Sequence, residues 1–433
     1  MTRILLALVL SLAPMAASAQ VTVREVTSPA GIDAWMVEEP ALPFVALEIL
    51  FPGGTSLDPE GAEGAAALMA SMLGQGAGDL DAQGFAEATE GLALDVSFDA
   101  GPDAVSVSAR FLSEVTDEAT DLLRLALTAP RFDADAFARA QARALSSARS
   151  AQRNPNALAS RRLAELAWGD HPYARPGDGT EDSLAALSTD ALRAAHARGL
   201  SRDRVHVAAV GDIDAEGLGR LLDRLLGALP AASGEMPDRG TVALTGGVTH
   251  VPFDGPQAVV AFGQPGIYRD DPDFFAAFVM AEVLGGGRFG TRLMRALREE
   301  RGLTYGVGAF LGSRAFGDML QGRFATSPDR VDEAIDVVRA EWTRMAEEGL
   351  SAKELEAIQT YLTGAYPLRF DGNARIASIL ASMQLQGFGP DYIAQRNDLV
   401  MAVTPAQVAE VAGRLLAPDA LHFVVVGPPD VSQ

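Results

Sequence analysis

The chain has 433 residues, a net charge of −22 and no cysteine, so disulfides, thiolate zinc sites, thiol nucleophiles and iron–sulfur clusters are excluded. The acidic balance argues against nucleic acid and anionic membrane surfaces as partners. It suits a basic peptide or protein, but it also simply keeps an exported protein soluble, and the second explanation is preferred.

The first 19 residues have the features of a secretory signal peptide. Arg3 supplies the charged start, Ile4–Ala13 is apolar, and Ala17-Ser18-Ala19 forms a small-residue cleavage site before Gln20. Removing residues 1–19 leaves 414 residues with a net charge of −23, enough for two or more domains. No later apolar run reaches the roughly 18 residues that span a bilayer. Export without cysteine predicts a periplasmic protein.

Strands are followed by helices in the first half of the chain. Phe44–Phe51 is an apolar strand, and Leu94–Phe98 and Val105–Phe111 alternate apolar and polar residues across a Gly101-Pro102-Asp103 turn, which predicts an antiparallel hairpin. Helical patterns follow over Glu114–Leu127, Ala134–Gln152 and Ala157–Trp168. This order is typical of an α+β fold rather than of alternating βαβ units.

An internal repeat divides the chain. Leu187–Gly211 and Val403–Gly427 align without gaps at an offset of 216, and each predicts a capped amphipathic helix, a turn and an apolar strand that ends at glycine. Identical residues at matched positions include Arg198 and Arg414, Asp203 and Asp419, and His206 and His422.

The starts of the two halves also correspond. In each half a strand leads through Asp-Pro (Asp58 or Asp271) to an apolar helix ending at Gly74 or Gly285. The sequence therefore predicts two homologous domains at 20–230 and 248–433, joined by a Pro/Gly-rich linker at 231–247.

Three stretches resemble the insulinase/pitrilysin-type peptidases, and among these the bacterial relatives of the mitochondrial processing peptidase. Residues 285–293 (GGGRFGTRL) and 297–305 (LREERGLTY) resemble the second-domain signature. His171-Pro172-Tyr173 with Gly179-Thr180 resembles the end of the first domain, and 362–371 (LTGAYPLRFD) a helical region of the second. The resemblance implies two homologous domains, each an antiparallel-rich sheet packed with helices, together forming half of a clam-shell chamber.

Active members of this family carry H-x-x-E-H on a helix of the first domain. Two His at i and i+4 share one helical face and bind one zinc, the intervening Glu acts as base, and a downstream Glu is the third ligand. Ala67, Ala70 and Ser71 occupy the His, Glu and His positions, and no Glu lies between Arg131 and Ser160. The resemblance therefore implies an inactive first domain without zinc or any other cofactor. The five histidines show no metal-ligand spacing, so no substitute site is predicted.

Arg298 and Tyr305, seven residues apart, match the family's substrate-contacting pair. The resemblance implies that Arg298 and Tyr305 donate hydrogen bonds to the substrate carbonyl and to the oxyanion that develops on it. In the family this pair belongs to the half of the enzyme opposite the zinc. Gly285, Gly286 and Gly287 occupy the place of a glycine-rich loop that touches substrate in the processing peptidase. Without the resemblance, the arginine is a helix-surface residue, the tyrosine lies on a strand, and the glycines form a helix end and a turn.

The leading hypothesis is a zinc-less subunit of a periplasmic heterodimeric peptidase. A homologous partner supplies H-x-x-E-H and its zinc, and this chain supplies chamber wall and the substrate contacts. The alternative is a degenerate peptidase-fold protein that binds peptides or acts as a scaffold in the cell envelope. A lone active peptidase with other zinc ligands is the least favoured hypothesis.

Overall fold

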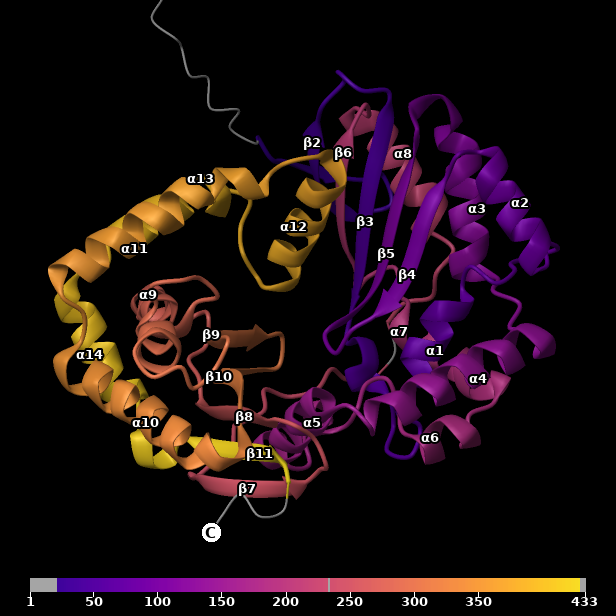
Figure 1. The fold of residues 1–433 in the computed structure, drawn as a ribbon. Helices are drawn as coiled ribbons and strands as arrows, with labels where there is room; N and C mark the ends of the chain where they lie inside the picture. The colour runs from indigo at the N-terminus through magenta and orange to yellow at the C-terminus, as the bar shows by residue number, and fades with distance from the viewer. Residues whose placement is uncertain (1–21, 233, 429–433) are drawn as a thin grey trace, which may run out of the picture.

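The computed structural model describes residues 22–232 and 234–428, so the expected signal peptide lies outside the described residues. Two sheets organise the fold (Figure 1). The first has the strand order β1-β2-β6-β3-β5-β4 and the second the order β7-β11-β8-β10-β9. Their bounds are β1 Arg24–Thr27, β2 Asp33–Glu38, β3 Phe44–Pro52, β4 Asp95–Ala100, β5 Ala104–Leu112, β6 His206–Gly211, β7 Gly247–Pro252, β8 Ala258–Pro265, β9 Val307–Arg314, β10 Gly317–Thr326 and β11 His422–Gly427.

The two sheets share one topology. In the first, β2 is parallel to β6, and the neighbours β6/β3, β3/β5 and β5/β4 are antiparallel. The second repeats this pattern with β7 parallel to β11 and antiparallel pairs β11/β8, β8/β10 and β10/β9. Strand β1 is an additional antiparallel edge of the first sheet. The predicted fold of two homologous, antiparallel-rich α+β halves is confirmed.

Fourteen α-helices accompany the sheets in the described part of the chain. They are α1 Ala65–Met72, α2 Ala82–Gly91, α3 Thr116–Thr128, α4 Ala134–Ala151, α5 Pro155–Trp168, α6 Glu181–Ala186, α7 Thr189–Gly199, α8 Ala215–Leu226, α9 Phe274–Gly285, α10 Val331–Glu348, α11 Ala352–Ala365, α12 Asn373–Leu385, α13 Tyr392–Met401 and α14 Pro405–Leu415. Short 3₁₀ turns join several of them, and residues Met294–Glu299 form a π-helical segment.

Local sequence signals set the repeated units. In the second copy, Thr404 caps α14 by accepting from the backbone N–H of Gln407, whose side chain accepts from the backbone N–H of Thr404. In the first copy, Ser188 caps α7 in the same place. The alternating residues of β4 and β5 pair as the expected hairpin, with Phe98 opposite Val107. These short-range features explain why the helix–strand repeat and the hairpin were predictable.

One helix of each half packs on the sheet of the other half. Helix α12 lies against β3 and β6 of the first sheet, and α5 lies against β8 and β11 of the second (Figure 1). Leu380 and Ala381 of α12 are buried with Trp35, Ala46 and Val210. The reciprocal cluster contains Leu163 and Trp168 of α5 with side chains of β8 and β11, namely Val259, Ala261, Val424 and Val426. Each sheet is therefore covered on one face by its own helices and on the other by the exchanged helix.

Hydrogen bonds also join the halves. The side-chain amide of Gln384 on α12 donates to the backbone carbonyl of Val207 on β6 at 2.9 Å. The phenol of Tyr173 accepts from the backbone N–H of Phe316 at 2.9 Å and donates to Asp103. Across the described residues, no helix is both long and apolar enough to cross a membrane.

Candidate functional site

Helix α1 carries the positions that the sequence aligns with the zinc motif, and a buried carboxylate fixes the start of this helix. Asp58 is 3 % exposed, and both of its side-chain oxygens accept from the backbone N–H of Ala66, at 3.1 and 3.2 Å. Burial raises the pKa of Asp58 to about 6, although the charges of Arg198 and Arg175 oppose the shift. The acid thus satisfies an otherwise free donor in the first turn of α1.

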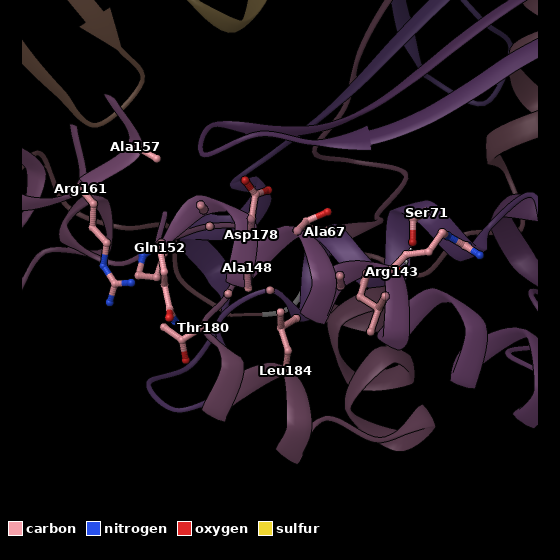
Figure 2. Close-up of a pocket in the computed structure, with 18 of the residues that line it drawn as sticks. Ala67, Ser71, Arg143, Ala148, Gln152, Ala157, Arg161, Asp178, Thr180 and Leu184 are labelled. Atoms are coloured by element: carbon pink, nitrogen blue, oxygen red, sulfur yellow. Dashed lines mark hydrogen bonds between the residues drawn. The ribbon is translucent and has the colours of Figure 1, made fainter. Parts of the chain in front are cut away.

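The motif positions differ in their environment. Ala67 and Ser71, at the two His positions, lie one helical turn apart and both line a pocket (Figure 2). Ala70, at the Glu position, is fully buried. The Ser71 hydroxyl donates to the backbone carbonyl of Leu68 at 2.8 Å, so it serves the helix itself.

The pocket beside α1 has a volume of about 560 Å³, within the range of sites that hold small ligands. Helix α4 forms the opposite wall, with Ala144, Ser147 and Ala148, and α5 adds Ala157 and Arg161. The segment Pro176–Thr180 and Leu184 of α6 close another side (Figure 2). Small side chains therefore leave open the space between α1 and α4.

Zinc does not fit this pocket. Methyl groups and one hydroxyl stand at the positions that would present imidazoles, and the facing residues of α4 carry no carboxylate. Asp178 is the single acidic residue among those that line the pocket. Throughout the described residues, no three His, Asp or Glu side chains are grouped so that they could hold a metal ion.

Four of the histidines have contacts or burial that account for them as packing residues. His422 contacts the carbonyl of Gly246 at 2.6 Å and the hydroxyl of Thr249 at 2.9 Å. His171 accepts from the N–H of Tyr173, and His196 contacts the carbonyl of Leu127. His206 in β6 is the repeat counterpart of His422. Burial lowers the pKa of His206 and so favours the neutral ring. The pocket lining contains no histidine, so a hydroxyl there has no imidazole base.

Arg298 lies in the π-helical segment, a type of distortion that is frequent at functional sites. Its guanidinium carbon lies 4.9 Å from the ring centroid of Phe289, which is itself 71 % exposed. The backbone carbonyl of Arg298 accepts from the N–H of Gly302 at 3.0 Å, and Gly302 has a φ of +60°. This turn leads the chain from Arg298 towards Tyr305.

Tyr305 is held at the surface by a short turn. The Thr304 hydroxyl donates to the carbonyl of Gly306 at 2.9 Å and accepts from its N–H at 3.2 Å. The hydroxyl of Thr326 donates to the carbonyl of Leu303 at 2.6 Å, which fixes the preceding residue. Tyr305 itself is 85 % exposed. Its backbone is thus constrained while its ring and hydroxyl are free to contact another molecule.

The three consecutive glycines end α9, and they differ in their surroundings. A Cβ on Gly285 would lie 2.5 Å from the backbone nitrogen of Ala309 in β9, so close helix–strand packing requires glycine there. A Cβ on Gly286 would meet the Glu282 side chain, whereas Gly287 has open space around it. Packing alone accounts for Gly285, and Gly287 is the glycine of the three that a ligand can approach freely.

The structure places the two predicted sites apart. The residues that line the pocket at α1 include none from 285–305. Arg298 and Tyr305 instead occupy a surface segment of the second half, with the exposed Phe289 beside the arginine.

Sequence reasoning missed how this segment is anchored. Arg292 is buried, and its guanidinium makes two hydrogen bonds to Glu354 of α11, at 2.8 and 3.0 Å, and one to the carbonyl of Gly349. These hydrogen bonds lower the pKa of Glu354 to about 2. The partners are 62 residues apart, so no local motif signals the pair. The sequence also showed no sign of a second pocket, beside α9, that is lined by arginine and aromatic side chains.

Family models match both halves of the chain. A model described as insulinase (peptidase family M16) matches residues 35–181, and one described as peptidase M16 inactive domain matches residues 186–362. Among curated proteins, the non-peptidase homolog YmxG of Helicobacter pylori is 27% identical over 77% of each chain. An uncharacterized zinc protease of Streptomyces coelicolor is 29% identical over 59% of this chain and 57% of its own length.

Solved structures agree with the family models. A peptidase M16 inactive domain from Pseudomonas fluorescens superposes with a TM-score of 0.87 at 29% identity, covering 95% of this chain and 99% of that one. A protease from Helicobacter pylori has a TM-score of 0.84 at 14% identity over 94% and 99% of the chains, which shows a shared fold. With both halves matched by models of one family and the same topology repeated in each, the chain belongs to peptidase family M16, the insulinase family.

Proposed function

We propose that this chain is the non-catalytic subunit of a heterodimeric zinc peptidase. The observation that carries the proposal is the contrast between its two candidate sites. The positions that would bind zinc are Ala67 and Ser71, facing a pocket without imidazoles, whereas Arg298 and Tyr305 lie on a well-anchored surface segment. The chain has therefore kept donors for a substrate and lacks the groups that activate water.

In the proposed complex, a homologous partner contributes H-x-x-E-H and its zinc, and this chain contributes chamber wall. A guanidinium and a phenol hydroxyl are suited to hydrogen-bond a peptide carbonyl and the charge that develops on its oxygen. The similarity to a non-peptidase homologue and to an M16 inactive domain supports this division of labour. Location in the periplasm is part of the proposal and rests on the sequence of residues 1–19.

Reconstitution tests the proposal. The chain would be purified alone and together with a homologue that carries H-x-x-E-H, encoded by a neighbouring gene, and peptide cleavage and bound zinc would be measured. We expect no cleavage and no stoichiometric zinc for this chain alone, and a stable pair that cleaves peptides faster than the homologue by itself. Stoichiometric zinc in the isolated chain, or full activity of the homologue without it, would contradict the proposal.

The alternative of a peptide-binding or scaffold protein is favoured by one observation. The pocket at α1 remains open, about 560 Å³, although the zinc ligands are gone. Such a pocket can bind part of a peptide without any catalytic partner. A stable homodimer, measured by mass in solution, that forms no complex with the zinc-bearing homologue would favour this alternative.

A further inference from the structure

A second pocket, of about 510 Å³, lies in the other half of the chain. Helix α9 contributes Phe274, Phe275 and Phe278, and β9 contributes Leu311 and Ser313. Arg269, which precedes α9, the exchanged helix α12 with the residues on either side of it, and the first half of α13 complete the lining. The pocket therefore lies between α9 and a helix that packs on the first sheet.

The internal repeat relates this pocket to the one at α1. Gly74, which follows α1, and Gly285, which ends α9, are 211 residues apart. Applied to the pocket residues, the same offset matches Gly64 with Phe275 and Ala67 with Phe278. The 218-residue offset between the starts of α5 and α12 matches Ala157 with Arg375. Each pocket thus lies between α1 or its repeat counterpart α9 (the α1-type helix) and the exchanged helix of the same half, α5 or α12. At the matched positions the first pocket has small residues, and the second has aromatic and cationic ones.

The charge of the second pocket is opposite to that of the whole chain. Arg269, Arg369, Arg375 and Arg396 line it, and its lining contains no Asp or Glu. In the part of the chain that the structure describes, no carboxylate oxygen lies within 4.0 Å of these four guanidinium groups. The net charge of the chain is −22, so four unpaired arginines around one cavity are contrary to its overall composition.

Aromatic rings hold the two inner arginines. The guanidinium carbon of Arg269 lies 4.8 Å from the ring centroid of Phe388 and 5.1 Å from that of Phe274. Arg396, which is 6 % exposed, lies 4.5 Å from the ring of Tyr366. Stacking restrains a guanidinium through its face and leaves its edge N–H groups available to an acceptor.

The hydrogen bonds of these arginines leave donors free. Arg396 donates through Nη1 to the carbonyl of Leu362 at 2.8 Å and to Oδ1 of Asn397 at 3.2 Å, and no hydrogen bond of its Nη2 group to a described residue is recorded. The Arg269 side chain has no hydrogen-bond partner among the described residues. Burial lowers the pKa of both groups, with Tyr392 as the largest opposing influence, but a guanidinium remains charged at neutral pH. Asp318 and Glu282 influence Arg269 and Arg396 electrostatically without lining the pocket. Partly buried cations without a carboxylate partner are costly unless a ligand supplies the anion.

We propose that this pocket binds the carboxylate of a peptide whose carboxyl-terminal residue is aromatic. Guanidinium groups form paired hydrogen bonds with a planar carboxylate, and an aromatic side chain packs edge-to-face on the surrounding rings. The inference concerns the isolated chain and needs no zinc-bearing partner, so it can fail or succeed independently of the proposed function.

Calorimetric titration of the full chain tests this inference, with acetyl-Ala-Ala-Ala-Phe as the free acid and as the carboxyl-terminal amide. We expect the free acid to bind at least about tenfold more tightly than the amide, a difference of about 1.4 kcal/mol. Arg269→Gln should remove that preference, because this side chain makes no other hydrogen bond. The substitution should not lower the melting temperature, because it replaces a partly buried cation that has no anionic partner. Arg143→Gln, which changes an exposed arginine at the pocket beside α1, is the matched control and should bind as the wild type does.

Several results would overturn the inference. They are equal binding of acid and amide, no binding of either, an unchanged preference in Arg269→Gln, or an equal loss in Arg143→Gln. A titration with inorganic phosphate separates a peptide site from a general anion site. Phosphate that binds more tightly than the free-acid peptide, in a manner that depends on Arg269, would also overturn it.

Discussion

Asp58 and Arg198 in the first half correspond to Asp271 and Arg414 in the second, and each acid lies just before the α1-type helix. In the second half the pair is a direct ion pair at 3.3 Å, with the arginine half exposed. In the first half Arg198 acts on a buried acid, and its Nε lacks a hydrogen-bond partner among the described residues. The two residues thus form an ion pair at the surface in one copy, whereas in the other the arginine only influences a buried acid electrostatically.

The buried copy gives a pH prediction. Burial raises the pKa of Asp58 to about 6 in the folded protein, against 3.8 for the free residue. Since the folded state holds the proton more tightly, this acid favours folding below pH 4 and loses that contribution as the pH rises towards 6. The difference in free energy of unfolding between Asp58→Asn and the wild type should therefore shift by about 2–3 kcal/mol in favour of the variant as the pH rises from 4 to 7. Urea unfolding of both proteins at each pH measures the change, and a constant difference would contradict it.

The Arg292–Glu354 pair affects stability with the opposite pH dependence. Its hydrogen bonds hold the pKa of Glu354 at about 2, so the pair stabilises the fold above the ordinary carboxyl pKa and is lost as the pH falls towards 2. Glu354→Gln leaves the buried Arg292 without its anion and should cost about 3–5 kcal/mol at pH 7. Glu333→Gln, which removes an exposed ion pair with Arg330, should cost no more than about 1 kcal/mol. Similar losses in the two variants would show that Arg292 has another anion.

Helix α1, to which the sequence assigns the positions of the zinc motif, packs against α4. Ala67, Ser71 and Ala148 all line the pocket between the two helices (Figure 2). The variant Ala67→His/Ser71→His/Ala148→Glu should therefore bind zinc in a one-to-one ratio after dialysis, as measured by elemental analysis. The version without Ala67→His lacks one ligand and should lose most of the metal. Absence of zinc from the folded triple variant would show that the helices are not spaced as in an active site.

How much could be predicted from sequence differs between elements. Helix α14 and strand β11 carry local signals, a capping box and an apolar run ending at glycine, so their repeat was visible. The absence of the H-x-x-E-H residues could be predicted from sequence because that motif is confined to one helix. The exchange of α5 and α12 was not predictable, because a periodic helix does not specify which sheet it covers. The arginine pocket was missed because tertiary packing assembles it from residues between 269 and 396.

Because the exchanged helices pack on the sheet of the other half, we expect the two halves to unfold as one cooperative unit. Each sheet needs a helix of the other half to cover one of its faces. We expect a single urea transition, with Leu380→Ala on α12 lowering the stability of the entire chain by about 2–5 kcal/mol. Leu399→Ala, at an exposed position of α13, should change little. Two separate transitions, with only one affected by Leu380→Ala, would contradict this coupling.

In the proposed complex, this chain completes the active site of its zinc-bearing partner. The most direct measurement is kcat/KM of the reconstituted pair with Arg298→Ala or Tyr305→Phe in this chain, alongside Arg295→Ala as an exposed control in the same segment. Loss of one oxyanion donor should reduce kcat/KM by about 10²–10³, with zinc content and complex formation unchanged. An unchanged kcat/KM in both variants would show that neither side chain acts on the substrate in the complex.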